Sequence, residues 1–311
     1  SELLSKEAHL FSVKDVYQYI VASPEKSATG HNFFSSPNPT YGLKLSYYLK
    51  DDLKSRYESR QKDDKIKSSR GETINYPTTQ VLEEESKEKN PKILLTIMNS
   101  KGDLIRRINA DRTKGYHEKY WDLRTFSNRN IDEENNYSGP LVPPGSYTIH
   151  LEKFENNILS SLSDKIKFKV EQLGSKSSQA DREKLFTFQV KFDKLFSKFE
   201  KLVSEIEDAI ETVDGQINKV INSSTDKDIK SLNDKKGNLM DLRLVLTGTR
   251  SLDDYADVYS GSSPSVQSRL GGMSWELNNT TSLPTKTHEM TYEISKADYE
   301  QVLKTFNELM D

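Results

Sequence analysis

The sequence contains no cysteine in its 311 residues. Disulfide bonds, thiol nucleophiles and thiolate metal sites are therefore excluded from any account of its fold or chemistry. Avoidance of cysteine fits an extracytoplasmic bacterial protein, but it fits many cytosolic proteins too, so it leaves the compartment open.

Long apolar runs are also absent. No stretch of 18 apolar residues occurs, so we expect no segment that spans a bilayer. The N-terminal segment from Ser1 to Glu7 is charged and lacks the pattern of a signal peptide. We therefore expect either a cytosolic chain or the mature or trimmed part of something larger.

Charge of one sign is not in excess, because the formal net charge is -3 and Lys and Glu are mixed along the chain. This balance gives no electrostatic reason to expect binding to nucleic acid or to an anionic membrane. Only 33% of the residues are hydrophobic and 30% are charged, which suits small or elongated domains with much solvated surface. The length predicts roughly two domains.

The first domain is predicted from strands in residues 30–173. Between Tyr41 and Lys50, apolar and polar residues alternate strictly, which is the period of a half-buried strand. Three more extended segments follow in residues 92–151, separated by Gly- and Pro-containing turns. A closing strand, Ile166 to Val170, comes after a hairpin turn at Asn156-Asn157. This order predicts an immunoglobulin-like (Ig-like) antiparallel β-sandwich.

Two polar segments interrupt this domain, and a further segment precedes it. Residues 51–90 are dense in charge and poor in apolar residues, so we expect a mobile, partly helical insertion whose ends lie close together. Thr78 is near the expected start of a helix within it. Residues 128–138 form a second polar insertion. Residues 1–29 carry one apolar patch and are predicted to be a connector that docks on the domain after it.

The second domain is predicted to be a bundle of three or four helices over residues 180–311, after a Ser-rich linker. Its first helix has apolar residues at alternating spacings of three and four, as in a helix that packs in coiled-coil fashion. This stripe consists of Leu185, Phe188, Phe192, Leu195, Phe199, Leu202, Ile206, Ala209 and Val213. We interpret the stripe as core, although it could instead dock a partner helix.

Shorter helices are predicted after this one. The second ends near Gly248, and the third begins near Ser265 and is predicted to stop at Gly271-Gly272. The last is predicted to begin at Ser295, because the four residues from Ser295 to Asp298 resemble a capping box. The fold class is therefore α+β, an all-β domain followed by an all-α domain.

No catalytic or metal-binding arrangement stands out. The segment 128–136 is rich in oxygen ligands but lacks the spacing and glycine of an EF-hand calcium loop. There is no Gly-rich phosphate loop and no GxSxG motif. The histidines do not occur at the spacings of metal ligands. They are His9, His31, His117, His150 and His288. We therefore expect no cofactor, no metal and no catalysis by this chain.

Aromatic residues offer the one candidate contact surface. Strand alternation places Tyr47 in the core, and we expect Trp121 there too. Tyr48 and Tyr120 should face solvent on one sheet, where they could contact a partner or form a stacking platform for a carbohydrate.

Several motifs in this chain occur together in a known family. They are Phe33–Gly42 (FFSSPNPTYG), Tyr47–Lys50 (YYLK), Thr96–Gly102 (TIMNSKG), Gly139–Tyr147 (GPLVPPGSY), Leu246–Arg250 (LTGTR) and Ser265–Leu270 (SVQSRL). With these motifs the chain resembles the C-terminal, non-propeller region of large secreted bacterial proteins with sortilin-like (BNR, Asp-box) repeats, which are commonly labelled glycosyl hydrolases. The segment Gly102 to Tyr147 also resembles the Ig-like domain of the flagellar hook-capping protein.

The resemblance implies an extracytoplasmic, Bacteroidota-like bacterial setting, with this chain as an appendage of a larger polypeptide or complex. It transfers no catalytic residue, because any active site of such a protein is expected in the propeller. The leading hypothesis is a non-catalytic accessory module that binds a protein partner or its parent propeller. The alternatives are a carbohydrate-binding module and part of a glycan-degrading hydrolase.

Overall fold

The computed structural model confirms the α+β class. It describes residues 5–19, 39–128, 138–174, 177–222, 227–248 and 264–311. The chain divides into two compact units, each with its own core. Unit 1 comprises residues 1–126 and 142–176, and unit 2 comprises residues 127–141 and 177–311.

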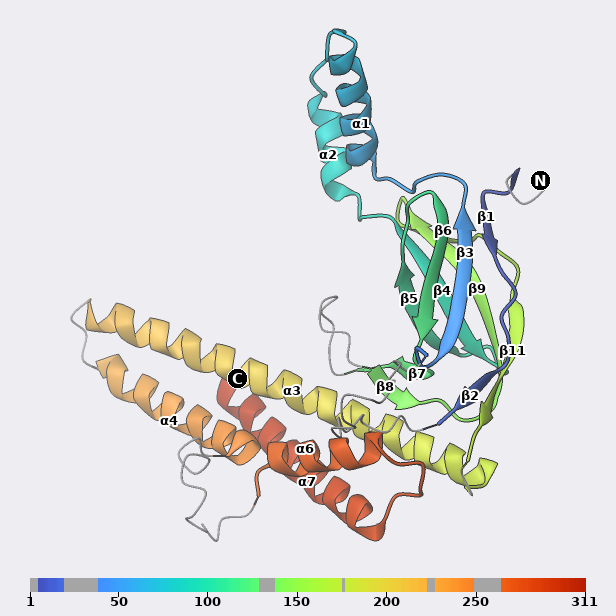
Figure 1. Cartoon of the computed structure of the whole chain (residues 1–311). Coiled ribbons are helices and arrows are strands. Elements are labelled where there is room, and N and C mark those ends of the chain that lie inside the picture. The colour runs from blue at the N-terminus through green and yellow to red at the C-terminus, as the bar shows by residue number, and fades with distance from the viewer. Residues whose placement is uncertain (1–4, 20–38, 129–137, 175–176, 223–226, 249–263) are drawn as a thin grey trace, which may run out of the picture. The chain divides into compact units, whose positions relative to one another are not determined.

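Unit 1 is a β-sandwich of two sheets (Figure 1). Sheet A contains, in spatial order, β1 (Ala8–Leu10), β3 (Leu43–Leu49) and β6 (Gly115–Trp121). Sheet B contains, in spatial order, β2 (Val16–Gln18), β11 (Ile166–Gln172), β9 (Gly145–Glu155), β4 (Lys92–Asn99) and β5 (Leu104–Ala110), while β10 (Ile158–Ser161) pairs with β9. A short strand, β7 (Arg124–Phe126), follows β6.

The strand pairing is that of the Ig-like fold. β1 pairs antiparallel with β3 in sheet A, whereas β2 pairs in parallel with β11 in sheet B. The N-terminal segment therefore crosses from one sheet to the other. The remaining order, β11-β9-β4-β5 facing β3-β6, matches the GFC and BE strand sets of such sandwiches.

The N-terminal connector expected over residues 1–29 instead supplies two strands of the sandwich. Ala8 and Leu10 are buried, and Gln18 is 1% exposed with its side-chain amide donating to the Val142 carbonyl oxygen at 2.7 Å. Each strand has only three residues, and so short a segment shows no alternation from which a strand could be predicted.

Aromatic side chains fill one end of the sandwich core. Tyr47 and Trp121 are fully buried, as predicted. The rings of Trp121, Tyr147 and Phe168 have centroids about 6 Å apart. The Tyr147 hydroxyl donates to the Pro143 carbonyl oxygen at 2.6 Å, four residues upstream. This bond is the tyrosine corner that fixes the start of the equivalent strand in Ig-like domains.

The charged insertion at residues 51–90 forms a helical hairpin of α1 (Arg56–Ser69) and α2 (Thr79–Lys87), which projects from the end of the sandwich (Figure 1). α2 begins where a helix was expected, and the Thr78 side chain caps its first turn. The Arg56 N–H donates to the Glu88 carboxylate at 2.8 Å, which confirms that the ends of the insertion lie close together.

Ion pairs hold the hairpin together. Neither helix buries a residue, so apolar packing contributes little between them. Arg60 makes two hydrogen bonds of 2.7 Å to Glu85, and Arg56 makes one to Glu84. At the root, Arg112 of unit 1 donates two hydrogen bonds of 2.7 Å to Glu58 and another to the Leu53 carbonyl oxygen. Charge-assisted hydrogen bonds thus hold the two helices to each other and to the sandwich.

Unit 2 contains four helices among its described residues. They are α3 (Gln179–Ile221), α4 (Lys227–Thr247), α6 (Val266–Asn278) and α7 (Lys286–Met310). The stripe predicted along the first helix lies in their shared core, with Phe188 partly buried and the other eight members buried. α4 ends at Thr247, before Gly248 with φ +80°, as predicted.

The third helix does not stop at Gly271-Gly272. α6 runs on to Asn278, because Val266, Leu270, Met273 and Leu277 form one buried stripe across the glycines. The packing of this stripe outweighs the cost of glycine in a helix, about 1 kcal/mol per residue.

The last helix begins ten residues before the predicted start. Thr285 is its N-cap, and its side chain accepts a hydrogen bond from the His288 N–H. Ser295 lies fully buried within α7, where its hydroxyl accepts from Arg269 Nε at 3.3 Å. The sequence Ser295 to Asp298 is therefore a packing feature of the helix interior and not a cap.

Residues 128–138, expected as an insertion of the sandwich, belong to the segment 127–141, which groups with unit 2 and includes β8 (Ser138–Leu141). The buried Asp193 carboxylate on α3 anchors the segment. It accepts hydrogen bonds from the Ser127 hydroxyl, the Asn128 N–H and the Asn128 side-chain amide at 2.7 to 2.9 Å. Most of the segment weighed as a calcium loop, residues 129–136, lies outside the described residues.

We predict that the Arg112→Gln substitution raises the pKa of Glu58. The Arg112 guanidinium, together with the Ser55 N–H, lowers the pKa of Glu58 from its usual 4.5 to about 2. A lowered carboxyl pKa stabilises the hairpin root above the usual pKa, and this stabilisation is lost as pH falls toward 2. An NMR titration of the Glu58 side-chain carbon would show the midpoint rising toward 4.5.

The Arg70→Gln substitution is a matched control, because Arg70 lies at the exposed far end of α1. It should leave the Glu58 midpoint unchanged. A midpoint that stays at about 2 in the Arg112→Gln variant would contradict the assignment of the anchor.

Candidate functional site

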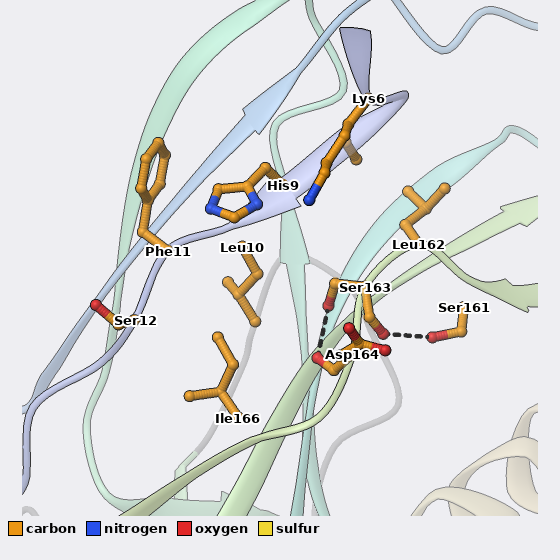
Figure 2. A pocket seen from close by; sticks show the side chains of 11 residues that line it. Lys6, His9, Leu10, Phe11, Ser12, Ser161, Leu162, Ser163, Asp164 and Ile166 are labelled. Carbon is orange, nitrogen blue, oxygen red and sulfur yellow. Dashed lines mark hydrogen bonds between the residues drawn. The ribbon is translucent and has the colours of Figure 1, made fainter. Parts of the chain in front are cut away.

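The candidate site of the sandwich lies beside its N-terminal strand. It is a groove with a volume of about 790 Å³ between β1 with the residues around it and the segment Ser161–Asp164 (Figure 2). Leu10 and Ile166 lie at its base, while Lys6 and His9 lie on one side and Ser163 and Asp164 on the other. The groove arises where the N-terminal chain leaves sheet A for sheet B.

One wall of the groove is a strand edge with outward-facing backbone groups. In an antiparallel pair, alternate residues direct their N–H and C=O groups toward the partner strand. The Phe11 N–H donates to the Ser46 oxygen, and the Lys50 N–H donates to the Glu7 oxygen, both at 3.0 Å. Ala8 and Leu10 therefore direct their backbone groups away from β3, on the side of the groove that both residues line.

The opposite wall is an interruption of the last strand. β10 pairs with the outer half of β9 and β11 with its inner half. The Leu162 N–H still donates to the Leu151 carbonyl oxygen at 2.7 Å, so the ladder is interrupted at residues 163–165. There the Leu151 N–H donates to the Ser163 hydroxyl at 2.9 Å, in place of a strand carbonyl. The hairpin turn before β10 is at Asn156-Asn157, both with positive φ, as predicted. Sheet B thus recedes from β1 at this point and leaves the groove open.

An ion pair fastens β1 across the sandwich. Lys153 of β9 donates to the Glu7 carboxylate at 2.7 Å. The Glu7 carboxylate raises the pKa of Lys153 above its usual value. Beyond the groove, the Asp15 carboxylate accepts a hydrogen bond of 2.7 Å from the Lys169 N–H in sheet B. The N-terminal segment is held at both ends of its crossing, and the groove lies between.

The groove lining is suited to binding and not to proton transfer. Its titratable groups are Lys6, His9 and Asp164, and His9 makes no hydrogen bond to Asp164. The Ser161 and Ser163 hydroxyls donate to carbonyl oxygens of their own segment at 2.9 and 3.0 Å. An extended peptide binds to an apolar base, polar rims and a strand edge that, among the described residues, pairs with no further strand.

Tyr48 and Tyr120 lie on the outer face of sheet A but are not adjacent. Tyr48 is opposite Tyr116, and His9 is opposite Tyr48, so three aromatic rings form a row across the sheet. Tyr120 is opposite Lys44, four residues beyond Tyr116 and about 13 Å from it along β6. Tyr116 is 55% exposed and Tyr120 41%. The prediction from sequence alone did not include Tyr116, although it shares the alternation of Tyr120.

A cluster of polar and titratable residues lies on the outer face of sheet B. Glu152 of β9 accepts hydrogen bonds from the Thr96 hydroxyl and from Arg107 Nε, and lies 3.2 Å from His150 Nε2. Burial raises the pKa of Glu152, but the hydrogen bonds from Thr96 and His150 outweigh it, so the pKa lies below its usual value. These partners keep Glu152 ionised and fix its position on the sheet.

The described histidines remain apart from one another. His117 bonds to the Thr113 carbonyl oxygen and His288 to Glu276, each at 2.6 Å. His31 lies outside the described residues. Among the residues that the structure describes, no three His, Asp or Glu side chains are grouped as a metal site would require.

Comparisons with protein-family models, with curated proteins and with solved structures found no match to this chain. None of the described helices combines the length and the apolarity needed to cross a bilayer. The functional interpretation therefore rests on the geometry of the two units.

We predict that the Lys153→Met substitution loosens β1 without unfolding the sandwich. Removing the Glu7 ion pair should speed hydrogen exchange of the His9 and Phe11 amides about two- to fivefold, since such partly exposed pairs contribute less than about 1 kcal/mol. The Lys167→Met substitution, at an exposed position of β11, should leave these rates unchanged. Equal exchange in both variants would show that the ion pair does not hold β1.

Proposed function

We propose that this chain is a non-catalytic interaction module, and that unit 1 binds an extended polypeptide segment in the groove beside β1. The observation that carries the proposal is the backbone of Ala8 and Leu10, whose N–H and C=O groups face the groove. A partner strand would add to sheet A beside β1 and complete these hydrogen bonds.

The dimensions of the groove limit the length of segment that can bind. An edge of three residues spans about 10 Å, so it offers hydrogen bonds to a short segment only. Side chains of the bound strand that point inward would contact Leu10, Leu162 and Ile166 at the base of the groove. Specificity would then come from these contacts, and orientation from the backbone bonds.

The charged residues at the start of β1 would limit non-specific pairing at its edge. Unprotected strand edges promote aggregation, and natural proteins limit them with short strands and charged residues. β1 is short, and Lys6 and Glu7 stand at its start. These features favour docking of one specific segment over open-ended sheet extension.

The family resemblance supports a wider setting for this module. In that setting the chain is an accessory part of a secreted or surface-associated bacterial propeller protein, and the bound segment belongs to a protein partner or to the parent propeller. A glycan-degrading activity, if the parent has one, would reside in the propeller, because the resemblance transfers no catalytic residue to this chain.

Site-specific cross-linking tests the groove. Ser12 lines it and is exposed, whereas Lys14, two residues on, is exposed and outside it. The photoreactive residue p-benzoylphenylalanine at Ser12, in native cells, should give an adduct to one polypeptide segment, identified by mass spectrometry. The same residue at Lys14 should give no such adduct.

A blocking variant separates docking from chance proximity. The Ser12→Trp substitution fills the mouth of the groove and should weaken binding of the identified segment by about tenfold or more, whereas Lys14→Trp should not. Equal adducts at both positions, or binding that Ser12→Trp leaves intact, would refute the groove as the site.

A carbohydrate-binding function is a second candidate, favoured by the aromatic row on the outer face of sheet A. The Tyr116 ring is exposed, and Phe11 lies 5.8 Å from it. However, Phe11 meets both Tyr116 and His9 edge-on, which provides less flat surface than a sugar ring prefers.

A glycan array tests this second function directly. If it holds, the chain should bind a defined glycan, and Tyr116→Ala and Tyr48→Ala should each weaken binding about tenfold. The Tyr17→Ala substitution is a control, because Tyr17 is similarly exposed but lies on β2. Absence of binding to any glycan would remove this candidate and leave the peptide groove unaffected.

A further inference from the structure

A stripe of lysines runs along the first half of α3. Its members are separated by seven, three, four and three residues, so they lie on one side of the helix over about 25 Å. They are Lys184, Lys191, Lys194, Lys198 and Lys201. No acidic residue interrupts the stripe, since the intervening position at this spacing is Thr187. The mixed charge of the whole chain conceals this local arrangement.

The stripe borders a groove between α3 and α7 with a volume of about 500 Å³. Val190, Leu195 and the rings of Tyr292 and Tyr299 provide its apolar surface. Burial raises the pKa of both tyrosines, so their hydroxyls stay neutral at physiological pH. Ammonium groups therefore stand beside an uncharged, partly aromatic floor.

The bordering lysines differ in whether a described carboxylate pairs with them. Lys191 pairs with Glu293 at 3.1 Å and lies 4.1 Å from the centre of the Tyr292 ring. On α7, Lys296 pairs with Glu300 at 3.7 Å. Lys194 and Lys198, in contrast, make no ion pair with any residue that the structure describes. They lie about one turn apart and both line the groove.

We propose that the α3–α7 groove binds an acidic amphipathic helix of a partner protein. An apolar strip edged by unpaired lysines is complementary to a helix with leucine-type residues on one face and Asp or Glu beside them. Carboxylates three or four residues apart on that helix match the spacing of Lys194 and Lys198. The site lies in unit 2 and is independent of the strand groove of unit 1.

The acids around the groove favour a peptide over a nucleic acid. Glu293 and Glu300 lie on its α7 side, and Glu205 follows along α3, where Lys201 pairs with it at 3.4 Å. A long polyanion would meet these carboxylates, whereas a short acidic helix can place its charges on the lysines alone.

A selection experiment tests the proposal on the full chain. A display library of helical peptides of about 18 residues, on the order of 27 Å long, spans the groove and does not require the partner to be identified. We expect selected sequences enriched in Asp and Glu at spacings of three and four, with affinities that fall as ionic strength rises. The double substitution Lys194→Glu/Lys198→Glu should weaken their binding by about tenfold or more.

The control is a double charge reversal away from the groove, Lys230→Glu/Lys286→Glu, at exposed positions of α4 and α7. It should retain binding, and matching thermal unfolding of both variants should show that unit 2 stays folded. Selected peptides without acidic enrichment, or equal binding to both variants, would overturn the proposal. So would tight binding of a single-stranded oligonucleotide that the Lys194 and Lys198 reversals abolish, because it would assign the groove to nucleic acid.

Discussion

The crossing of the N-terminal chain from sheet A to sheet B is the constraint on which the rest of unit 1 depends. β1 must end before the chain crosses, over residues 11–15, to β2, so neither strand covers the full edge of its sheet. The Glu7–Lys153 ion pair and the Asp15–Lys169 hydrogen bond fix the two sides of the crossing. The direct result is an open groove beside a strand edge that no other described strand pairs with.

The features that were predictable from sequence are those with long, regular periods. Leu43, Leu45, Tyr47 and Leu49 alternate over seven residues, and all four are buried. The stripe on α3 repeats over more than seven turns, so its helical phase is unambiguous and its burial follows. The α+β class depends on these two signals, which is why it could be predicted correctly from the residues.

Local signals misled where tertiary packing outweighed them. Gly271-Gly272 resembles a helix end, but burial of Met273 and Leu277 continues α6 through it. Ser295 resembles an N-cap, but it lies within α7, and its hydroxyl accepts a hydrogen bond from Arg269 of α6. β1 and β2 are too short to show a period. The groove that they create could not be predicted, because it depends on which sheet each strand joins, and that is decided by pairing across more than a hundred residues.

The two units present different recognition chemistry, and each follows from how its core is built. In the sandwich, the inward side chains pack in the core. The proposed contact with a partner is therefore made by the backbone at the edge of β1, and the side chains of the groove select among extended segments. In the helical unit, the backbone is satisfied within each helix, so recognition must use side chains, and the lysine stripe of α3 provides charge. Binding to unit 1 should therefore depend on shape and be nearly insensitive to salt, whereas binding to unit 2 should depend strongly on salt. The two proposals together would let one chain hold two different partners, or two parts of one partner.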